Sequence, residues 1–528
     1  MRHRLLVLFA LPLVPVLACV GDDDKSPSAF ALPDASPLDA ALVDRDAGAT
    51  GVDGGAVERD ASPTRDADPD VVDASVDDAA DAAVTDAADG SVADAGPSGQ
   101  LDLTFNGTGY EVFALPADGG TIGYANAVAL DSTGRILVGG YQGGPGAVSA
   151  AVWRLGTTGA LDGTFGSGGV WTKTGTAAGA YDSVSGLAVD PTDRVVATGQ
   201  SNNGSPIYQA TWRLTTSGAL DTSFATKGFV TQTNTLGSGA YDLGNTVLVD
   251  GEGKVTVAGF SKVNASTIDL CAWRYTAGGV LDTANFASPS GFFSEHGAAN
   301  PSASPFDTAA AATFQGLNVV MVGTSYTGTT TAAVAVRVTA GGALDTTFNG
   351  TGRLVLKGIA GGAGATAYDS LSGVQTDGSG RIIVAGSSED GAGVFHPFVM
   401  RLLGDGSPDS TFGTAGKVIL PLPAGATNAF GGALARDGLG RFVVIGGTLG
   451  PSGMAVWRVS PDGVVDPSFG TGGVFTMTGT SRIGGGDAGP PNDVANGLAI
   501  DAQNRPVVVG ASLTAGMQDV AVVWRLTP

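Results

Sequence analysis

The stretch GALDTSF, from Gly218 to Phe224, sets an aspartate between a leucine and a phenylalanine. Close copies are GALDGTF at Gly159–Phe165 and GALDTTF at Gly342–Phe348. The aspartate of this LDxxF phrase recurs about every 60 residues, at Asp102, Asp162, Asp221, Asp282, Asp345, Asp409 and Asp466. Seven copies at one spacing indicate a repeat protein in which each unit packs against its neighbours.

Each unit holds four short runs typical of β-strands. An apolar run ends in Asp (LAVD, Leu187 to Asp190), and after the turn PTDR a β-branched run ends in Gly (VVATG, Val195 to Gly199). A third run ends in Trp-Arg-Leu, and the fourth follows the LDxxF phrase. We therefore predict an all-β fold, a seven-bladed β-propeller of four-stranded antiparallel blades spanning residues 101–528. The repeats start near residues 101, 160, 219, 280, 343, 407 and 464.

The LDxxF phrase, the D-x-x-G-R turn and the WRL strand together resemble the delta-sixty repeat. The resemblance covers residues 101–528. It implies a propeller fold and a location at the bacterial surface or outside the cell. It implies no particular activity.

The first residues are typical of an export signal. A basic MRHR precedes the apolar run LLVLFALPLVPVLA, which is too short for a spanning helix. Val16–Cys19 resembles a lipobox, which implies cleavage after residue 18 and a lipid on Cys19. The resulting lipoprotein would be anchored at the bacterial cell surface or on the periplasm-facing outer membrane. The alternative is an ordinary signal peptide followed by an incidental cysteine.

Residues 19–100 differ sharply in composition from the repeats. Residues 20–100 contain 19 Asp and one Glu against one Lys and three Arg. Such a segment buries too little apolar area to offset the entropy of ordering, so we expect a disordered acidic tether. Residues 101–528 carry 21 basic and 30 acidic side chains, a balance that argues against a nucleic-acid partner.

The ring is expected to close through the first strand. The array begins with a fourth-type run at Gly109–Leu115 and ends with a third-type run at Val520–Leu526, so we expect these two to pair. Third runs carry an Arg, and in six units an Asp follows eight residues later, as in Arg154–Asp162 and Arg213–Asp221. Arg525 lacks this Asp and Asp102 lacks this Arg. We expect the two to meet in a charge-assisted contact.

An acidic position recurs just before the first strand of several units, usually after an aromatic residue. Its members are Asp182, Asp242, Asp307, Asp369 and Asp493. These carboxylates are candidates to ring the mouth of the channel and attract a cation or polar ligand. In the alternative interpretation each Asp caps a turn while the aromatic residue packs between blades.

The fourth unit is irregular. It carries the insertion Ala287–Phe306, lacks the hairpin Asp and Gly, and has Val336 in place of Trp. We expect the insertion to expose Phe292, Phe293, Glu295 and His296, of which the two phenylalanines and His296 are candidate ligand contacts. The alternative is a decayed repeat with a floppy loop.

Catalytic motifs are absent: there is no H-E-x-x-H, G-x-S-x-G or phosphate loop. The two histidines of the mature chain, His296 and His396, lie far apart in sequence and predict no metal site. No cofactor is expected, beyond a cation at the channel mouth. We predict a monomeric, non-enzymatic scaffold that binds extracellular protein or glycan through variable loops. The alternatives are a propeller enzyme acting on polysaccharide through paired carboxylates and a purely structural envelope protein.

Overall fold

The computed structural model describes residues 98–528, apart from 115–121, 145, 203–205, 238–240, 265, 302–305, 363–366, 481–491 and 515–517. All described residues belong to one of the two compact units into which the chain divides, and only that unit is described here. The predictions for the signal peptide, for Cys19 and for the acidic tether concern residues outside the described part.

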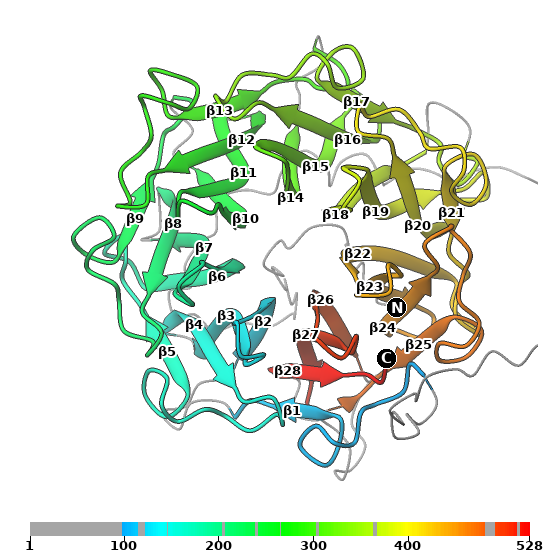
Figure 1. Ribbon diagram of the computed structural model, residues 1–528, viewed down its shortest axis with the longest axis horizontal. Helices are drawn as coiled ribbons and strands as arrows, with labels where there is room; N and C mark the ends of the chain where they lie inside the picture. Colours follow the sequence, from blue (N-terminus) through cyan, green and yellow to red (C-terminus); the bar gives the residue numbers. More distant parts are fainter. Residues whose placement is uncertain are drawn as a thin grey trace, which may run out of the picture. The chain divides into compact units, whose positions relative to one another are not determined.

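The described residues form an all-β structure without helices, as predicted (Figure 1). No helix in this part of the chain is therefore long and apolar enough to cross a membrane. Neighbouring strands within each repeat pair antiparallel. The strands are β1 (Tyr110–Val112); β2 (Ile122–Leu130), β3 (Ile136–Gly144), β4 (Ala147–Leu155), β5 (Val170–Lys173); β6 (Tyr181–Val189), β7 (Val195–Asn202), β8 (Ile207–Leu214), β9 (Phe229–Gln232); β10 (Asp242–Val249), β11 (Val255–Asn264), β12 (Thr267–Tyr275), β13 (Phe292–Glu295); β14 (Asp307–Gln315), β15 (Asn318–Tyr326), β16 (Thr331–Val338), β17 (Arg353–Leu356); β18 (Asp369–Thr376), β19 (Ile382–Glu389), β20 (Phe395–Leu402), β21 (Lys417–Ile419); β22 (Asn428–Arg436), β23 (Phe442–Leu449), β24 (Gly453–Val459), β25 (Val474–Met477); β26 (Asp493–Ile500), β27 (Pro506–Leu513) and β28 (Asp519–Arg525).

Strands β10 to β25 form four sheets of four consecutive strands, and β2 to β9 form one sheet of eight. The eight-stranded sheet consists of two four-stranded halves that are joined by a single parallel pair, Val148 with Tyr181. The next repeats make the same contact as isolated bridges, Ile207 with Tyr241 and Ile268 with Phe306. In Figure 1 the repeats follow one another in chain order. The innermost strands are β2, β6, β10, β14, β18, β22 and β26.

Glycine ends the β-branched second run because of a β-bulge in the first strand. In the β6–β7 pair the register shifts between Val184 and Gly186, opposite Gly199. A Cβ on Gly199 would lie 2.0 Å from the carbonyl oxygen of Ser183, closer than any side chain tolerates. The same close approach, at 1.7–2.0 Å, occurs at every equivalent glycine, namely Gly140, Gly199, Gly259, Gly323, Gly386, Gly446 and Gly510.

The hydrophobic core lies between successive sheets. One cluster joins Val320 and Val322 of β15 to Ile382 and Val384 of β19, all fully buried. Because both faces of a sheet are covered in this way, the strands are apolar almost continuously instead of alternating with polar residues. Equivalent clusters join the other neighbouring sheets, including Val507 of β27 with Val138 of β3.

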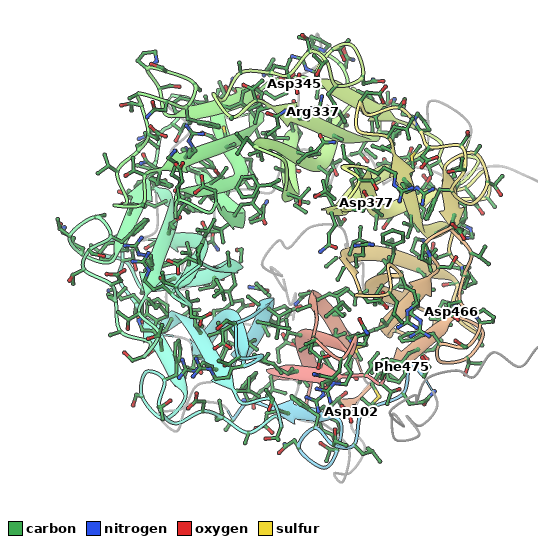
Figure 2. The ribbon with its side chains drawn as sticks, viewed as in Figure 1. Asp102, Arg337, Asp345, Asp377, Asp466 and Phe475 are labelled. Carbon is green, nitrogen blue, oxygen red and sulfur yellow. The ribbon has the colours of Figure 1, made fainter. Side chains whose placement is uncertain are left out.

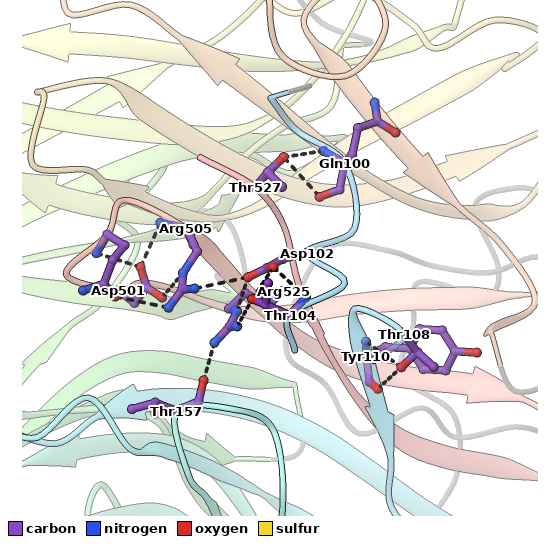
Figure 3. Close-up of polar contacts among 11 residues, drawn as sticks. Gln100, Asp102, Thr104, Thr108, Tyr110, Thr157, Asp501, Arg505, Arg525 and Thr527 are labelled. Atoms are coloured by element: carbon purple, nitrogen blue, oxygen red, sulfur yellow. Dashed lines mark hydrogen bonds and ion pairs between the residues drawn. The ribbon is translucent and has the colours of Figure 1, made fainter. Parts of the chain in front are cut away.

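The last sheet combines the two ends of the described chain, in the order β1-β28-β27-β26. Tyr110 pairs with Trp524 and Val112 with Val522. The Nε atom of Arg525 lies 2.7 Å from Oδ2 of Asp102, so the two residues left without a partner in the sequence lie in contact (Figure 3). The innermost strands also contact one another in succession, from β2 through β6 and onward to β26, and β26 contacts β2.

Candidate binding face

The strand registers place two kinds of connection at opposite ends of the sheets. The first–second hairpins and the LDxxF turns share one end, which we call the locked face. The second–third connections and those that enter each first strand share the other end, which we call the loop face. The two faces differ in how much they vary between repeats.

The LDxxF phrase forms an arginine–aspartate pair in every repeat of the locked face. Arg213 of β8 donates to Asp221 (2.8 Å) and Ser223 (3.0 Å) of its own phrase, and its guanidinium lies 4.8 Å from the centre of the Phe224 ring. It also donates to the carbonyl of Ala277 in the next repeat, at 2.6 Å. The phrase therefore joins neighbouring sheets. The Arg–Asp distances of the seven pairs are 2.7–2.9 Å, and Figure 2 labels Arg337 with Asp345.

The glycine of the phrase completes this joint. Gly279 has a φ of +79°, and a Cβ there would lie 2.8 Å from the amide nitrogen of Ala225 and 2.9 Å from the ring of Phe224. A glycine is needed for both reasons, backbone conformation and close approach. The phenylalanines of the phrases are at most 1% exposed.

The hairpins add a second carboxylate–arginine pair to the locked face. Arg194 donates to Asp190 of its own hairpin at 2.6 Å and to Asp221 of the phrase at 3.2 Å. Burial alone would raise the pKa of Asp221, but hydrogen bonds from Ser223 and the charge of Arg213 outweigh it and hold that pKa below its ordinary value. These carboxylates are ions that are paired within the fold.

The loop face varies from repeat to repeat. The connections into the first strands range from the short segment 174–180 before β6 to the long segment 478–492 before β26. The second–third connections range from 145–146 to 390–394. Variable connections on a rigid framework are the usual position of binding sites.

Three of the recurring aspartates of the loop face end a relay of hydrogen bonds. Trp212 donates through Nε1 to the hydroxyl of Thr176 (3.0 Å), which donates to Asp182 (2.7 Å). The hydroxyl of Ser201 donates to the other oxygen of Asp182 at 2.5 Å. Equivalent relays are Trp273–Thr235–Asp242 and Trp524–Thr480–Asp493.

These contacts agree with the alternative interpretation, in which each aspartate caps a turn. Asp182, Asp242, Asp307 and Asp493 are fully buried and Asp369 is 1% exposed. Aromatic residues at the neighbouring position pack on second- or third-strand rings, as Tyr241 does on Phe260 (5.5 Å) and Phe430 on Phe395 (5.1 Å). Within the described residues, no three His, Cys, Asp or Glu side chains lie close enough to hold a metal ion. Ligand binding by these aspartates stays a prediction.

Asp307 departs from the relay. Val336 stands in place of the tryptophan, and the loop donates the amide of Gly297 in place of a threonine hydroxyl. Ser325 is paired with Asp307 in the strand register, as Ser201 is with Asp182. Oδ1 of Asp307 accepts no hydrogen bond from the residues that the structure describes. Burial raises the pKa of Asp307 to about 6, and the nearby Asp269 carboxylate adds to the rise, whereas the polar groups of Ser325, Gly297 and Ala298 lower it.

Asp269 belongs to a second unusual pair in the same corner. Its Oδ1 lies 2.8 Å from Nδ1 of His296, whose side chain is 50% exposed, while that of Asp269 is 9% exposed. The corresponding pair of the first repeat is neutral, Ser149 with Thr174 at 2.5 Å. Burial raises the pKa of Asp269, and His296 opposes this rise. We call Asp269, His296 and Asp307 the acidic corner.

The expected exposure of the insertion is wrong for two of its residues. Phe292–Glu295 form β13, the outer strand of its sheet, where Phe292 is half-buried, Phe293 is 9% exposed and Glu295 is 5% exposed. Glu295 is paired with Arg353 of β17, at 3.0 Å from Nη2. The segment supplies a fourth strand to the β10–β12 sheet, and strand pairing buries alternate side chains. Only His296, just beyond the strand, is well exposed.

Two further features of the loop face were not foreseen from the sequence. His396 of β20 lies 3.0 Å from Asp390, so both histidines of the described part pair with an aspartate on this face. A hollow of about 290 Å³ lies between segments 423–426 and 451–454, over Met454 and Met477. The hydroxyl of Thr448 donates to the carbonyl of Pro451 (2.9 Å), so this polar group is already engaged.

Three stretches of the chain, residues 132–165, 378–412 and 440–469, match the family model described as "Domain of unknown function (DUF5122) beta-propeller". Each match runs from a hairpin of the locked face to a phenylalanine of an LDxxF phrase. With the four-stranded antiparallel sheets, this match identifies the chain as a β-propeller scaffold.

Comparison with curated protein sequences returned no match. Among solved structures the chain is similar to the polysaccharide lyase Uly1, with 10% identity, 76% of this chain and 89% of the other covered, and a TM-score of 0.42. It is also similar to a protein of unknown function from Dyadobacter fermentans DSM 18053 (8% identity, 79% and 97% covered, TM-score 0.39). A third similar structure is prolyl oligopeptidase B from Galerina marginata (12% identity, 74% and 48% covered, TM-score 0.39). Likenesses at this level carry no argument about activity.

Proposed function

We propose that the chain is an exported lipoprotein whose delta-sixty repeats form a closed seven-bladed β-propeller, and that it binds extracellular protein or glycan through the loop face without catalysis. Residues 1–18 are the signal peptide, Cys19 carries the lipid, 19–100 are the tether and 101–528 are the propeller, which acts as a monomer. The observation that carries the binding role is the contrast between a locked face whose arginine–aspartate pair recurs in all seven repeats and a loop face whose connections vary in length.

Four contacts support the closure. β1 pairs with β28, and Asp102 pairs with Arg525. Asn496 donates to the carbonyl of Ala125 at 2.8 Å, as Asn126 donates to Val184 in the next sheet along. The guanidinium of Arg525 donates to the carbonyl of Thr157. Within the described residues, every equivalent arginine except Arg458 likewise donates to a carbonyl of the next repeat.

Closure is tested by replacing Glu111 and Val523, which are directly paired, with cysteine in the full chain. We expect an intramolecular disulfide, identified by mass spectrometry of the linked peptides. If only intermolecular links form, the first strand does not complete the last sheet of its own chain. Cys19→Ala in the same chain is expected to abolish incorporation of radiolabelled palmitate and to release the protein from membranes.

The binding role is tested by probing the full chain against a glycan array and a panel of extracellular matrix proteins. A bound ligand is expected to be lost when an arginine is placed in the hollow of the loop face by Ser452→Arg or beside the acidic corner by Asn300→Arg. The control variants Leu317→Arg and Leu439→Arg, at 80% and 64% exposed sites of the locked face, are expected to bind normally. The opposite pattern would assign binding to the locked face and refute the proposal.

A second candidate function, an enzyme acting on polysaccharide, is favoured by one observation. His296 is half exposed and is oriented by a buried aspartate at 2.8 Å, the arrangement of a general base. Incubation of the full chain with a panel of anionic and neutral polysaccharides, followed by reducing-end and unsaturated-product assays, tests this role. Turnover that disappears in His296→Gln and persists in His396→Gln would replace the binding role by catalysis.

A further inference from the structure

The segment that follows β13 is held to the loop face by three described anchors. The amide of Gly297 donates to Oδ2 of Asp307, the amide of Ala299 donates to the hydroxyl of Ser325 at 2.9 Å, and the side chain of Asn300 donates to the carbonyl of Thr327 at 3.0 Å. Of these acceptors only Asp307 changes its charge with pH. The hold on residues 296–301 is therefore coupled to one buried carboxyl group.

Asp307 is poorly placed to carry a negative charge. It is fully buried, it lacks the threonine hydroxyl that serves Asp182 and Asp242, and its Oδ1 accepts no hydrogen bond within the described residues. Burial is the main cause that raises its pKa to about 6.

The charges around Asp307 come from the neighbouring strands. β12 contributes Asp269, which repels the ionised form of Asp307, and His296, which follows β13, is bonded to Asp269. Glu295 of β13 is neutralised by Arg353 of β17. Asp242 of β10 accepts hydrogen bonds from Thr235 and Ser261. Ser325 of β15 is neutral. Among these groups, no lysine or arginine offsets the charge of Asp307.

We propose that the acidic corner is a proton-operated latch, which holds residues 296–301 against the sheet in acid and releases them above neutral pH. In acid, Asp307 is uncharged, so its burial costs little. Above neutral pH, Asp307 is a buried carboxylate near the carboxyl group of Asp269. The folded contact then loses stability relative to the released segment, in which both carboxylates are hydrated.

The latch adds regulation to the proposed function, on which this consequence rests. Residues 296–301 lie on the loop face, so their release changes the surface that a ligand meets at this corner. A ligand that needs the held segment binds in acid, and one that needs the released segment binds above neutral pH. The latch itself requires no ligand.

Hydrogen exchange of the full chain, followed by mass spectrometry of peptides that span residues 292–301, tests the latch at pH 5 and pH 8. After correction for the intrinsic rate, a group with a pKa near 6 in the held state and near 4 when released gives about tenfold more opening at pH 8 than at pH 5. Asp307→Asn, which cannot ionise, is expected to abolish this difference, whereas Asp182→Asn in the equivalent position of the second repeat is expected to keep it.

Equal protection of residues 292–301 at the two pH values in the unaltered chain would overturn the latch without any variant. A pH difference that survives in Asp307→Asn would also overturn it. If ligand binding maps elsewhere while the exchange difference is found, the latch stands and the proposed function at this corner fails. The two failures are thus distinguishable.

Discussion

Replacing Arg525 by methionine removes the guanidinium that joins the two ends of the described chain and keeps most of its apolar stem. Arg525 is 2% exposed and contacts Asp102 (2.7 Å), Thr104 (3.1 Å) and the ring of Phe105 (4.6 Å to its centre). Losing one partner of a buried ion pair costs about 3–5 kcal/mol, because the other charge stays buried. Asp102 retains Arg505 at 3.2 Å, so we expect a value near the lower limit, about 3 kcal/mol.

The assay is urea unfolding at pH 7, with the free energy of unfolding taken from midpoint shifts at unchanged slope. Arg213→Met is the matched control, because Asp221 likewise retains a second arginine, Arg194, at 3.2 Å and both partners belong to one continuous repeat. Arg436→Met, on an exposed side chain, is expected to change the free energy of unfolding by at most about 0.5 kcal/mol. If Arg525→Met costs below about 1 kcal/mol while Arg213→Met costs the full amount, the ends are not joined in solution and the reasoning is wrong.

Three further predictions concern the sheets and the loop face. Gly199→Ala should lower the free energy of unfolding by more than about 3 kcal/mol or prevent folding, because the added Cβ would lie 2.0 Å from a carbonyl oxygen. The control Gly163→Ala should be tolerated, because a Cβ there meets open space. Thermal unfolding distinguishes the two variants. Trp212→Phe removes the hydrogen-bond donor to Thr176 and should lower the free energy of unfolding by about 1–3 kcal/mol. A double-mutant cycle with Thr176→Val that shows no coupling would count against the relay. Asp307 has a folded-state pKa of about 6 against an ordinary value of 3.8, so its destabilising contribution is complete above pH 6 and disappears as the pH falls towards 4. Asp307→Asn should therefore stabilise the protein at pH 8 by up to about 3 kcal/mol and have little effect at pH 4, as measured by urea midpoints at both values; the reverse order would contradict the sign.

The strands could be predicted because residues with a local structural role recur at the same position in the repeats. The glycine that ends VVATG is required by a bulge, and the phenylalanine of LDxxF fills a joint beside an arginine. Asp102 and Arg525, which lacked partners in the linear pattern, lie 2.7 Å apart in space. The contact between Asp102 and Arg525 could be predicted from one sequence because the other six copies each contain both the arginine and the aspartate.

Features that occur once were harder to predict. Phe292–Glu295 looked like an exposed insertion, since the alternation that identifies a short outer strand spans only four residues. Asp269 and His296 lie 27 positions apart in the sequence, and their pairing is not part of a pattern that recurs in the repeats. A partial signal was nevertheless present. Val336 replaces the tryptophan that begins the relay in three other repeats, and Oδ1 of Asp307 has no hydrogen-bond partner among the described residues.

The meeting of the two ends leaves the described part of the chain without a frayed terminus. The amide of Gly99 donates to the carbonyl of Thr527 at 3.2 Å, and Leu101 bridges Leu526. Each end of the described part is therefore held by the other, and separating them requires these contacts to break. The same proximity makes circular permutants practicable: a short peptide linking Pro528 to Ser98, with new ends opened at Ser452, would retain every strand pair.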